Sequence, residues 1–159
     1  MSDAPTGPTR LTPETHARLQ AEVEDLTTRG RVEIAQAIEA ARALGDLSEN
    51  GDYHAAKDSQ GKMEARIRQL QALLKDAEVV EADPGGDTVE TGSVVTLRYE
   101  GDEEQAFFVG SIEERRGDMA VVSPSAPLGQ ALIGRGAGDT VEYQAPGGVL
   151  RVEIVKVGA

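Results

Sequence analysis

Two long segments in the N-terminal half of the chain carry apolar residues at helical spacing. In the first, apolar side chains recur three and four positions apart from about residue 12 to residue 44, with charged and amide residues between them. The second begins near Tyr53 and ends near Ala77, and its apolar positions form a narrow stripe at spacings of 7, 4, 3, 4 and 3. Because only a short connection joins the segments, we predict an antiparallel two-helix coiled coil.

The start and length of this coiled coil follow from local signals. Thr12 is suited to cap the first helix, Pro13 fits the first helical position, and Glu14 places an acid at the positive end of the helix dipole. A helix of about 30 residues would be roughly 45 Å long. Gly30 costs about 1 kcal/mol relative to alanine, so a bend or local loosening is expected there. We assign residues 12–82 to the coiled-coil domain.

The hydrophobic period changes from that of a helix to that of a strand after a turn-rich linker at residues 83–88. Alternating apolar and polar residues predict five short strands, with one short helix between the third and fourth at residues 125–134. The predicted strands cover residues 93–99, 105–112, 119–122, 140–143 and 149–155. This order predicts an α+β fold with a compact antiparallel sheet at residues 89–159. Residues 1–11, rich in proline and small polar residues, are expected to form a disordered tail.

Composition restricts the partners. The chain has 16 Lys and Arg against 28 Asp and Glu, giving a formal net charge of −12. This charge disfavours long-range attraction to bulk nucleic acid or to an anionic membrane, so any nucleic-acid contact should be local or indirect. There is no cysteine, which excludes disulfides and thiolate metal sites. Without a signal-peptide pattern or a long apolar run, we expect a cytoplasmic protein.

The turn between the two predicted helices, from Gly45 to His54, is acidic. Asp46 and Glu49 are three residues apart, so their carboxylates would share one face if the turn keeps helical geometry. Two carboxylates can share Mg²⁺, but this ion needs six oxygen ligands and the pair supplies only part of them. The rest would come from another molecule. The corresponding chemistry is phosphoryl transfer in which a metal ion and an oriented water act together.

A purely structural interpretation of the same turn stays open. Its acids could serve only to solubilise the turn and cap the second helix, and Asp52 suits the positive end of that helix. Asn50 and Gly51 favour a tight turn or a left-handed residue between the helices. His54 could bind a metal or shuttle a proton, although a lone histidine is more often a capping or packing residue.

Two basic residues, Arg42 and Lys57, flank the turn on opposite helices. They could neutralise the carboxylates or touch a phosphate, and a solvated ion pair is the more common outcome for such residues. No glycine-rich phosphate loop, HExxH pair or nucleophile elbow occurs in the chain. We therefore do not expect catalysis by this chain alone.

Short motifs in both halves of the chain add more specific information. They are GDLSENGDYHAAK at 45–57, QG at 60–61, EARI at 64–67, SP at 123–124, PL at 127–128 and LIG at 132–134. With these motifs the chain resembles the bacterial GreA/GreB family of transcript-cleavage factors, and the resemblance covers nearly all of the chain after residue 10 and is specific in both domains.

The resemblance implies a coiled coil that enters the secondary channel of RNA polymerase and an FKBP-like C-terminal domain that docks on the polymerase rim. Asp46 and Glu49 would be the acids that help to hold a catalytic Mg²⁺ shared with the polymerase, whose own active centre then cuts the 3′ end of backtracked RNA. The implied contacts with RNA or polymerase are Arg42, Lys57, Asn50 and Tyr53. The nascent RNA would be met only at the tip, and neither a membrane nor a small-molecule substrate is implied. A monomer is expected, because the helical seam is satisfied within one chain.

Three alternatives remain at this point. A protein of the same fold could occupy the polymerase channel and inhibit it without stimulating cleavage. A generic coiled-coil scaffold would not associate with RNA polymerase. Peptidyl-prolyl isomerisation by an FKBP-like domain is disfavoured, because such pockets are lined by aromatic residues and this chain has two Phe, three Tyr and no Trp.

Overall fold

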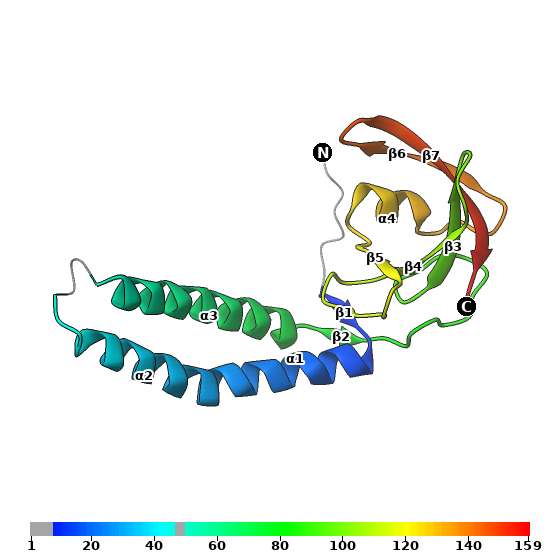
Figure 1. Cartoon of the computed structure of the whole chain (residues 1–159). Helices are drawn as coiled ribbons and strands as arrows, with labels where there is room; N and C mark the ends of the chain where they lie inside the picture. Colours follow the sequence, from blue (N-terminus) through cyan, green and yellow to red (C-terminus); the bar gives the residue numbers. More distant parts are fainter. Residues whose placement is uncertain (1–7, 47–49) are drawn as a thin grey trace. The chain divides into compact units, whose positions relative to one another are not determined.

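The computed structural model describes residues 8–46 and 50–159. Packing divides the chain into two compact units (Figure 1). The helical unit comprises Ala17–Asp76, and the sheet unit comprises the residues up to His16 together with Ala77–Ala159. No helix among the described residues is both long and apolar enough to cross a membrane.

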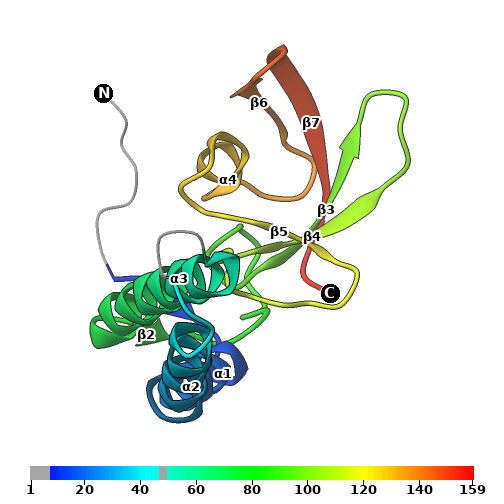
Figure 2. The same ribbon diagram turned by 60° about the vertical axis from the view of Figure 1, so that its left-hand side comes forward.

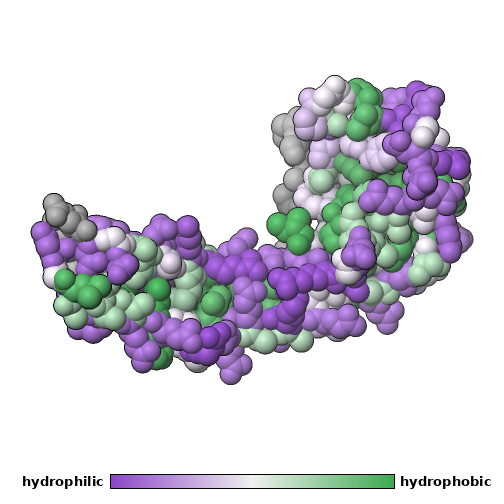
Figure 3. Space-filling view, viewed as in Figure 1, coloured by the Kyte–Doolittle hydropathy of each residue, from purple (hydrophilic) through white to green (hydrophobic). Residues whose placement is uncertain are grey.

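The helical unit is the predicted antiparallel hairpin. Its first arm is formed by α1 (Pro13–Asp25), a π-helical turn η1 (Leu26–Gly30) and α2 (Arg31–Arg42), and its second arm by α3 (Gly51–Lys75). Figures 1 and 2 both show α2 and α3 side by side. The seam buries apolar residues from both arms, namely Leu19, Ile38, Ala41, Ile67 and Leu70. Hydrophilic residues predominate around it in the view of Figure 3, which agrees with the narrow stripe in the sequence.

The irregularity expected at Gly30 is a π-helical turn that ends at this glycine. The Thr27 and Thr28 hydroxyls donate hydrogen bonds to carbonyls one turn earlier, at 2.8 and 2.7 Å, a pattern that competes with the helical ladder. Gly30 also lies close to α3, since a Cβ there would be 3.1 Å from the Met63 sulfur. A small residue is therefore suited to this position, where the arms approach each other.

The sheet unit contains five strands in the order β5-β4-β3-β7-β6 and one short helix, α4 (Pro127–Leu132). The strands are β3 (Val94–Tyr99), β4 (Gln105–Val109), β5 (Ala120–Val122), β6 (Thr140–Ala145) and β7 (Gly148–Val157). All five predicted strands and the predicted helix are present, but β4 ends at Val109 and not at residue 112, and β6 and β7 are longer than predicted. The sheet is antiparallel except for β4 and β5, which pair in parallel.

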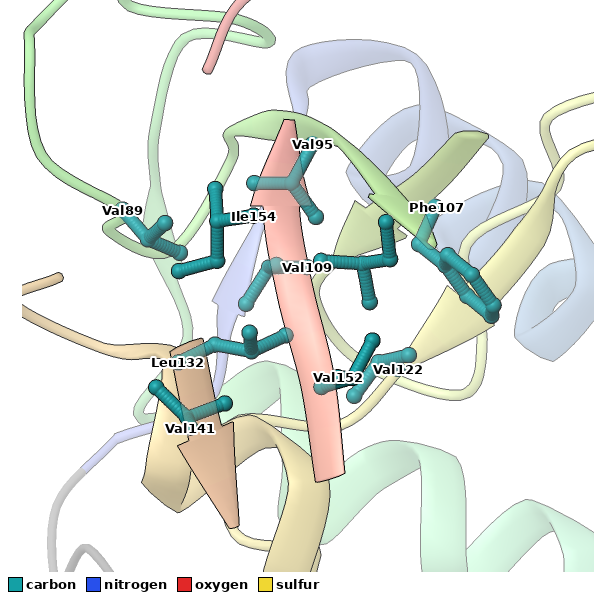
Figure 4. Packing of buried hydrophobic residues seen from close by; sticks show 10 residues of the cluster. Val89, Val95, Phe107, Val109, Val122, Leu132, Val141, Val152 and Ile154 are labelled. Carbon is teal, nitrogen blue, oxygen red and sulfur yellow. The ribbon is translucent and has the colours of Figure 1, made fainter. Parts of the chain in front are cut away.

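The core of this unit is a cluster of ten buried residues between the sheet and α4 (Figure 4). Val95 and Leu97 of β3 are almost completely buried, and the residue between them is more exposed, which agrees with the alternating sequence pattern. The other members are Val89, Phe107, Val109, Val122, Leu132, Val141, Val152 and Ile154.

The expected disorder of residues 1–11 is wrong at its C-terminal end. Arg10–Leu11 forms β1, which pairs in parallel with β2 (Glu78–Val79). The Leu11 side chain is fully buried, and its carbonyl accepts a hydrogen bond from the Val80 N–H at 2.8 Å. A strand of two residues is too short to carry a periodic pattern, so no local signal points to it. Residues 1–7 lie outside the described residues.

Within the sheet unit, which includes the first residues of α1, a buried carboxylate joins these residues to the loop after β4. Glu114 accepts hydrogen bonds from the Thr12 N–H and hydroxyl, the Thr15 hydroxyl and the Arg116 guanidinium, at 2.8 to 3.0 Å. Thr12 also caps α1, as predicted, by accepting a hydrogen bond from the Thr15 N–H at 3.4 Å. The Arg116 guanidinium carbon lies 4.2 Å from the centre of the Phe108 ring, within cation–π range.

Candidate functional site at the hairpin tip

The tip, residues 42–54, begins where α2 ends. The Leu44 N–H donates to the Ala41 carbonyl at 3.1 Å, and the Gly45 N–H donates to the Arg42 carbonyl at 3.3 Å. Gly45 then has φ of +123°, a conformation that favours glycine. This glycine turns the chain out of the helix immediately before Asp46.

The second arm begins with Asn50 as its N-cap. The backbone of Asn50 is extended, and its side-chain oxygen accepts a hydrogen bond from the Tyr53 N–H at 3.0 Å. Gly51 is the first residue of α3 with an ordinary negative φ, so the predicted tight turn or left-handed residue at Asn50-Gly51 is wrong. The left-handed glycine of this connection is Gly45. Asp52 lies in the first turn of α3, as expected for an acid at a helix N-terminus.

Asn50 also contacts the opposite arm. Its side-chain nitrogen donates a hydrogen bond to the Ala41 carbonyl in the last turn of α2. That carbonyl therefore accepts two hydrogen bonds, one from Leu44 and one from Asn50, which uses both of its lone pairs. One half-buried side chain thus joins the end of the first arm to the start of the second.

Aromatic and basic side chains gather beside this junction. The Arg42 guanidinium carbon lies 6.0 Å from the centre of the Tyr53 ring, at the outer limit of a cation–π contact. The His54 ring stands edge-on to Tyr53, with centroids 5.6 Å apart. The Lys57 ammonium donates to the Gln60 side-chain oxygen at 3.0 Å on the same helix. The structure therefore brings Arg42, Asn50 and Tyr53 together, and Lys57 follows one turn further along α3.

Of the two predicted metal-binding acids, the structure describes only Asp46. Asp46 is exposed directly after Gly45. Glu49 lies outside the described residues, so the pairing of the two carboxylates stays a prediction. Within residues 8–46 and 50–159, no group of three or more His, Asp or Glu side chains is arranged to hold a metal ion. Carboxylate oxygens are ligands that suit Mg²⁺, but two carboxylates alone leave its coordination incomplete.

Several arginines further down the hairpin are paired with carboxylates. Arg31 binds Glu64 at 2.9 Å and Arg66 binds Glu22 at 2.7 Å, and both pairs join the two arms. The Arg31 guanidinium holds the pKa of Glu64 below its usual value. Arg29 contacts Asp25 and Glu33 on its own arm. The positive charge of these residues is therefore partly neutralised within the hairpin.

The sequence predicted that the second helix starts near Tyr53, two residues after α3 begins, and it missed both the capping bond of Asn50 and its bond to the other arm. An asparagine before a helix is a recognised capping signal. Its second hydrogen bond, to a carbonyl nine residues earlier, depends on how the two helices are aligned, which no local pattern encodes.

Comparison with known proteins assigns both halves of the chain to one family. Residues 9–79 match the family model described as transcription elongation factor, N-terminal, and residues 83–159 match the model for the GreA/GreB C-terminal domain. The chain belongs to the GreA/GreB family of transcription elongation factors.

Curated relatives of this GreA/GreB-family protein agree over nearly the full length. The Streptomyces avermitilis protein named transcription elongation factor GreA is 45% identical over 93% of this chain and 92% of its own length. The Saccharopolyspora erythraea protein of the same name is 46% identical over 93% of this chain and 93% of its own length. The Chloroflexus aurantiacus protein of that name is 46% identical over 94% of this chain and 97% of its own. The solved structure of Thermus aquaticus Gfh1 aligns over 96% of this chain and 99% of its own at 26% identity, with a TM-score of 0.43. Family membership rests on the family models and the curated relatives.

Proposed function

We propose that this elongation factor inserts its hairpin tip into the secondary channel of RNA polymerase and stimulates the polymerase to cut backtracked RNA at its 3′ end. The observation that carries the proposal is the acidic turn at the end of a two-helix hairpin, in a chain of this family. Asp46 comes directly after the glycine that ends the first arm of the hairpin, and Glu49 follows it three positions later in the sequence. They are suited to act in the active centre of another molecule.

The donor set fits Mg²⁺ shared with a partner. Asp46 and Glu49 would hold the ion, and when bound it would stabilise charge on the RNA phosphate and lower the pKa of a bound water. The polymerase and the RNA phosphate would complete the coordination. This chain contributes two acids, the turn that presents them and the helices that deliver them, and it has no catalytic activity alone.

The flanking residues have supporting roles in this proposal. Arg42 and Lys57 place positive charge on opposite arms beside the acidic turn, where they can contact RNA phosphates or channel walls. The Tyr53–His54 pair offers aromatic surface to the same partners. Elsewhere the net charge of −12 disfavours binding to free nucleic acid, which agrees with RNA contact at the tip only.

The test uses a purified, backtracked elongation complex with Mg²⁺. Adding the full chain should release short 3′ RNA fragments, and the double variant Asp46→Asn, Glu49→Gln should lower the rate of release at least about 100-fold, because both metal ligands lose their charge. A matched control, Glu39→Gln with Asp58→Asn, removes two exposed acids from the same arms and should cut as the unmodified chain does.

Two outcomes would contradict the proposal. If the tip variant cuts as fast as the unmodified chain, Asp46 and Glu49 are not the acting residues. If the unmodified chain slows nucleotide addition and releases no fragments, the protein is a channel-binding inhibitor.

A further inference from the structure

The side chain of Asn50, at the hairpin tip, is hydrogen-bonded to both arms. Its oxygen accepts from the Tyr53 N–H in the first turn of α3, and its nitrogen donates to the Ala41 carbonyl in the last turn of α2. Both partners are main-chain groups of regular helices, and the Ala41 side chain is itself buried in the seam. The two bonds therefore connect rigid points rather than mobile side chains.

These bonds close the base of the acidic turn. The chain leaves α2 at Arg42 and enters α3 at Gly51, and the side chain of Asn50 spans the gap between the two helix ends. Both acids lie inside the segment that is closed in this way. Asp46 follows the left-handed Gly45, and Glu49 directly precedes Asn50 in the sequence.

We propose that Asn50 is a positioning residue that holds the base of the acidic turn by joining the two helix ends between which Asp46 and Glu49 lie in the sequence. The inference rests on the proposed function, because positioning matters only if these acids act together on a reacting centre. Catalytic groups must be held to a fraction of an ångström, and a displacement of about 1 Å can lower a rate by about 100-fold. A short turn without such a cross-bond would let its two ends move separately.

The chemistry of the side chain makes the test selective. Asparagine supplies one acceptor and two donor hydrogens on the same planar group. Aspartate has nearly the same shape and caps a helix equally well, but at neutral pH it has no hydrogen to donate to the Ala41 carbonyl. Asn50→Asp should therefore keep α3 capped while removing the bond between the arms.

The experiment measures RNA cleavage in the backtracked complex over a range of factor and Mg²⁺ concentrations. For Asn50→Asp we expect the maximal rate at saturating factor to fall about tenfold or more, while the half-saturating factor concentration changes less than about twofold. The half-saturating Mg²⁺ concentration should rise, because misplaced ligands hold the ion less well. Asn50→Ala should show the same loss of maximal rate with a lower melting temperature, since it also removes the cap.

Ser59→Asp is the matched control, because it adds the same charge at an exposed position two turns further along α3. It should leave the maximal rate and the Mg²⁺ requirement unchanged. If Asn50→Asp cuts like the unmodified chain, or changes only the half-saturating factor concentration, the inference is overturned and the proposed function stands. If the unmodified chain releases no RNA fragments, the proposed function fails, and the inference fails with it.

Discussion

The sheet unit and the helical unit hold their folds in different ways. In the sheet unit, ten buried residues, most of them from the five strands and α4, pack around one centre, and main-chain segments approach each other closely. In the helical unit, apolar contact is confined to a seam, and ion pairs such as Arg31 with Glu64 and Arg66 with Glu22 join the arms at the surface. The hairpin therefore depends on helix propensity and a thin seam, whereas the sheet unit depends on tight three-dimensional packing. Alanine substitutions of glycines should therefore have different effects on the stability of the two units.

The largest effect is expected at Gly129 in α4. A Cβ at this position would lie 2.0 Å from the Ser123 carbonyl oxygen and 2.9 Å from the Pro124 Cα, so the main chain itself would have to move. Gly129→Ala should lower the free energy of unfolding of the sheet unit by about 3 kcal/mol, as severe overpacking does. Native-state hydrogen exchange should show faster exchange in β3 and β7 and unchanged protection in α3.

Gly147→Ala is the control within the same unit. Gly147 lies in the turn between β6 and β7, has no positive φ, and has nothing within 4 Å of its missing Cβ. It should leave exchange in the sheet nearly unchanged. Equal exchange rates for the two alanine variants would contradict the view that close main-chain contact at α4 governs this unit.

A smaller effect is expected at the buried carboxylate of the sheet unit. Glu114→Gln keeps the shape of the side chain but replaces charge-assisted hydrogen bonds to Thr12, Thr15 and Arg116 with weaker ones, and it directs an N–H group toward donors. We expect a loss of about 2 kcal/mol, seen as faster amide exchange in the first turn of α1 and in residues 110–118.

Asp118→Asn provides the comparison for Glu114, because it removes the same charge from an exposed position in the same loop. Asp118→Asn should change the amide exchange rates of these residues little. A similar result for both variants would mean that net charge, and not the buried network, accounts for the effect at Glu114.

Most of the fold could be predicted from the sequence because most of it is periodic. Helical spacing identifies the seam positions Ile67 and Leu70, and the alternation of β3 predicts that Val95 and Leu97 lie in the core, where both are buried. Contacts between distant residues leave no such pattern. Glu114 is about 100 positions from the threonines that it binds, and nothing near it in the sequence indicates that its side chain is buried.

At the candidate site, too, local features could be predicted from the sequence and contacts between distant residues could not. The capping role of an asparagine at the start of α3 is a local property of the sequence, but its bond to the Ala41 carbonyl depends on the alignment of two helices. Asn50-Gly51 is a common turn dipeptide and predicts a left-handed residue at this position. In the structure Asn50 has an extended backbone and caps α3, and the left-handed glycine of this connection is Gly45. The pairing of Asp46 with Glu49 stays a prediction from their spacing and from family resemblance.

The smallest effect, and one of opposite sign, is expected at Gly61 in α3. This glycine is exposed, has helical neighbours on both sides, and has nothing within 4 Å of its missing Cβ. Gly61→Ala should stabilise the hairpin by about 1 kcal/mol through helix propensity alone, slowing amide exchange in α3 about fivefold. Gly30→Ala should gain less, because its Cβ would lie 3.1 Å from the Met63 sulfur and the arms would have to adjust. If Gly61→Ala instead destabilises the hairpin, tight packing and not helix propensity governs both units, and the contrast between them is lost.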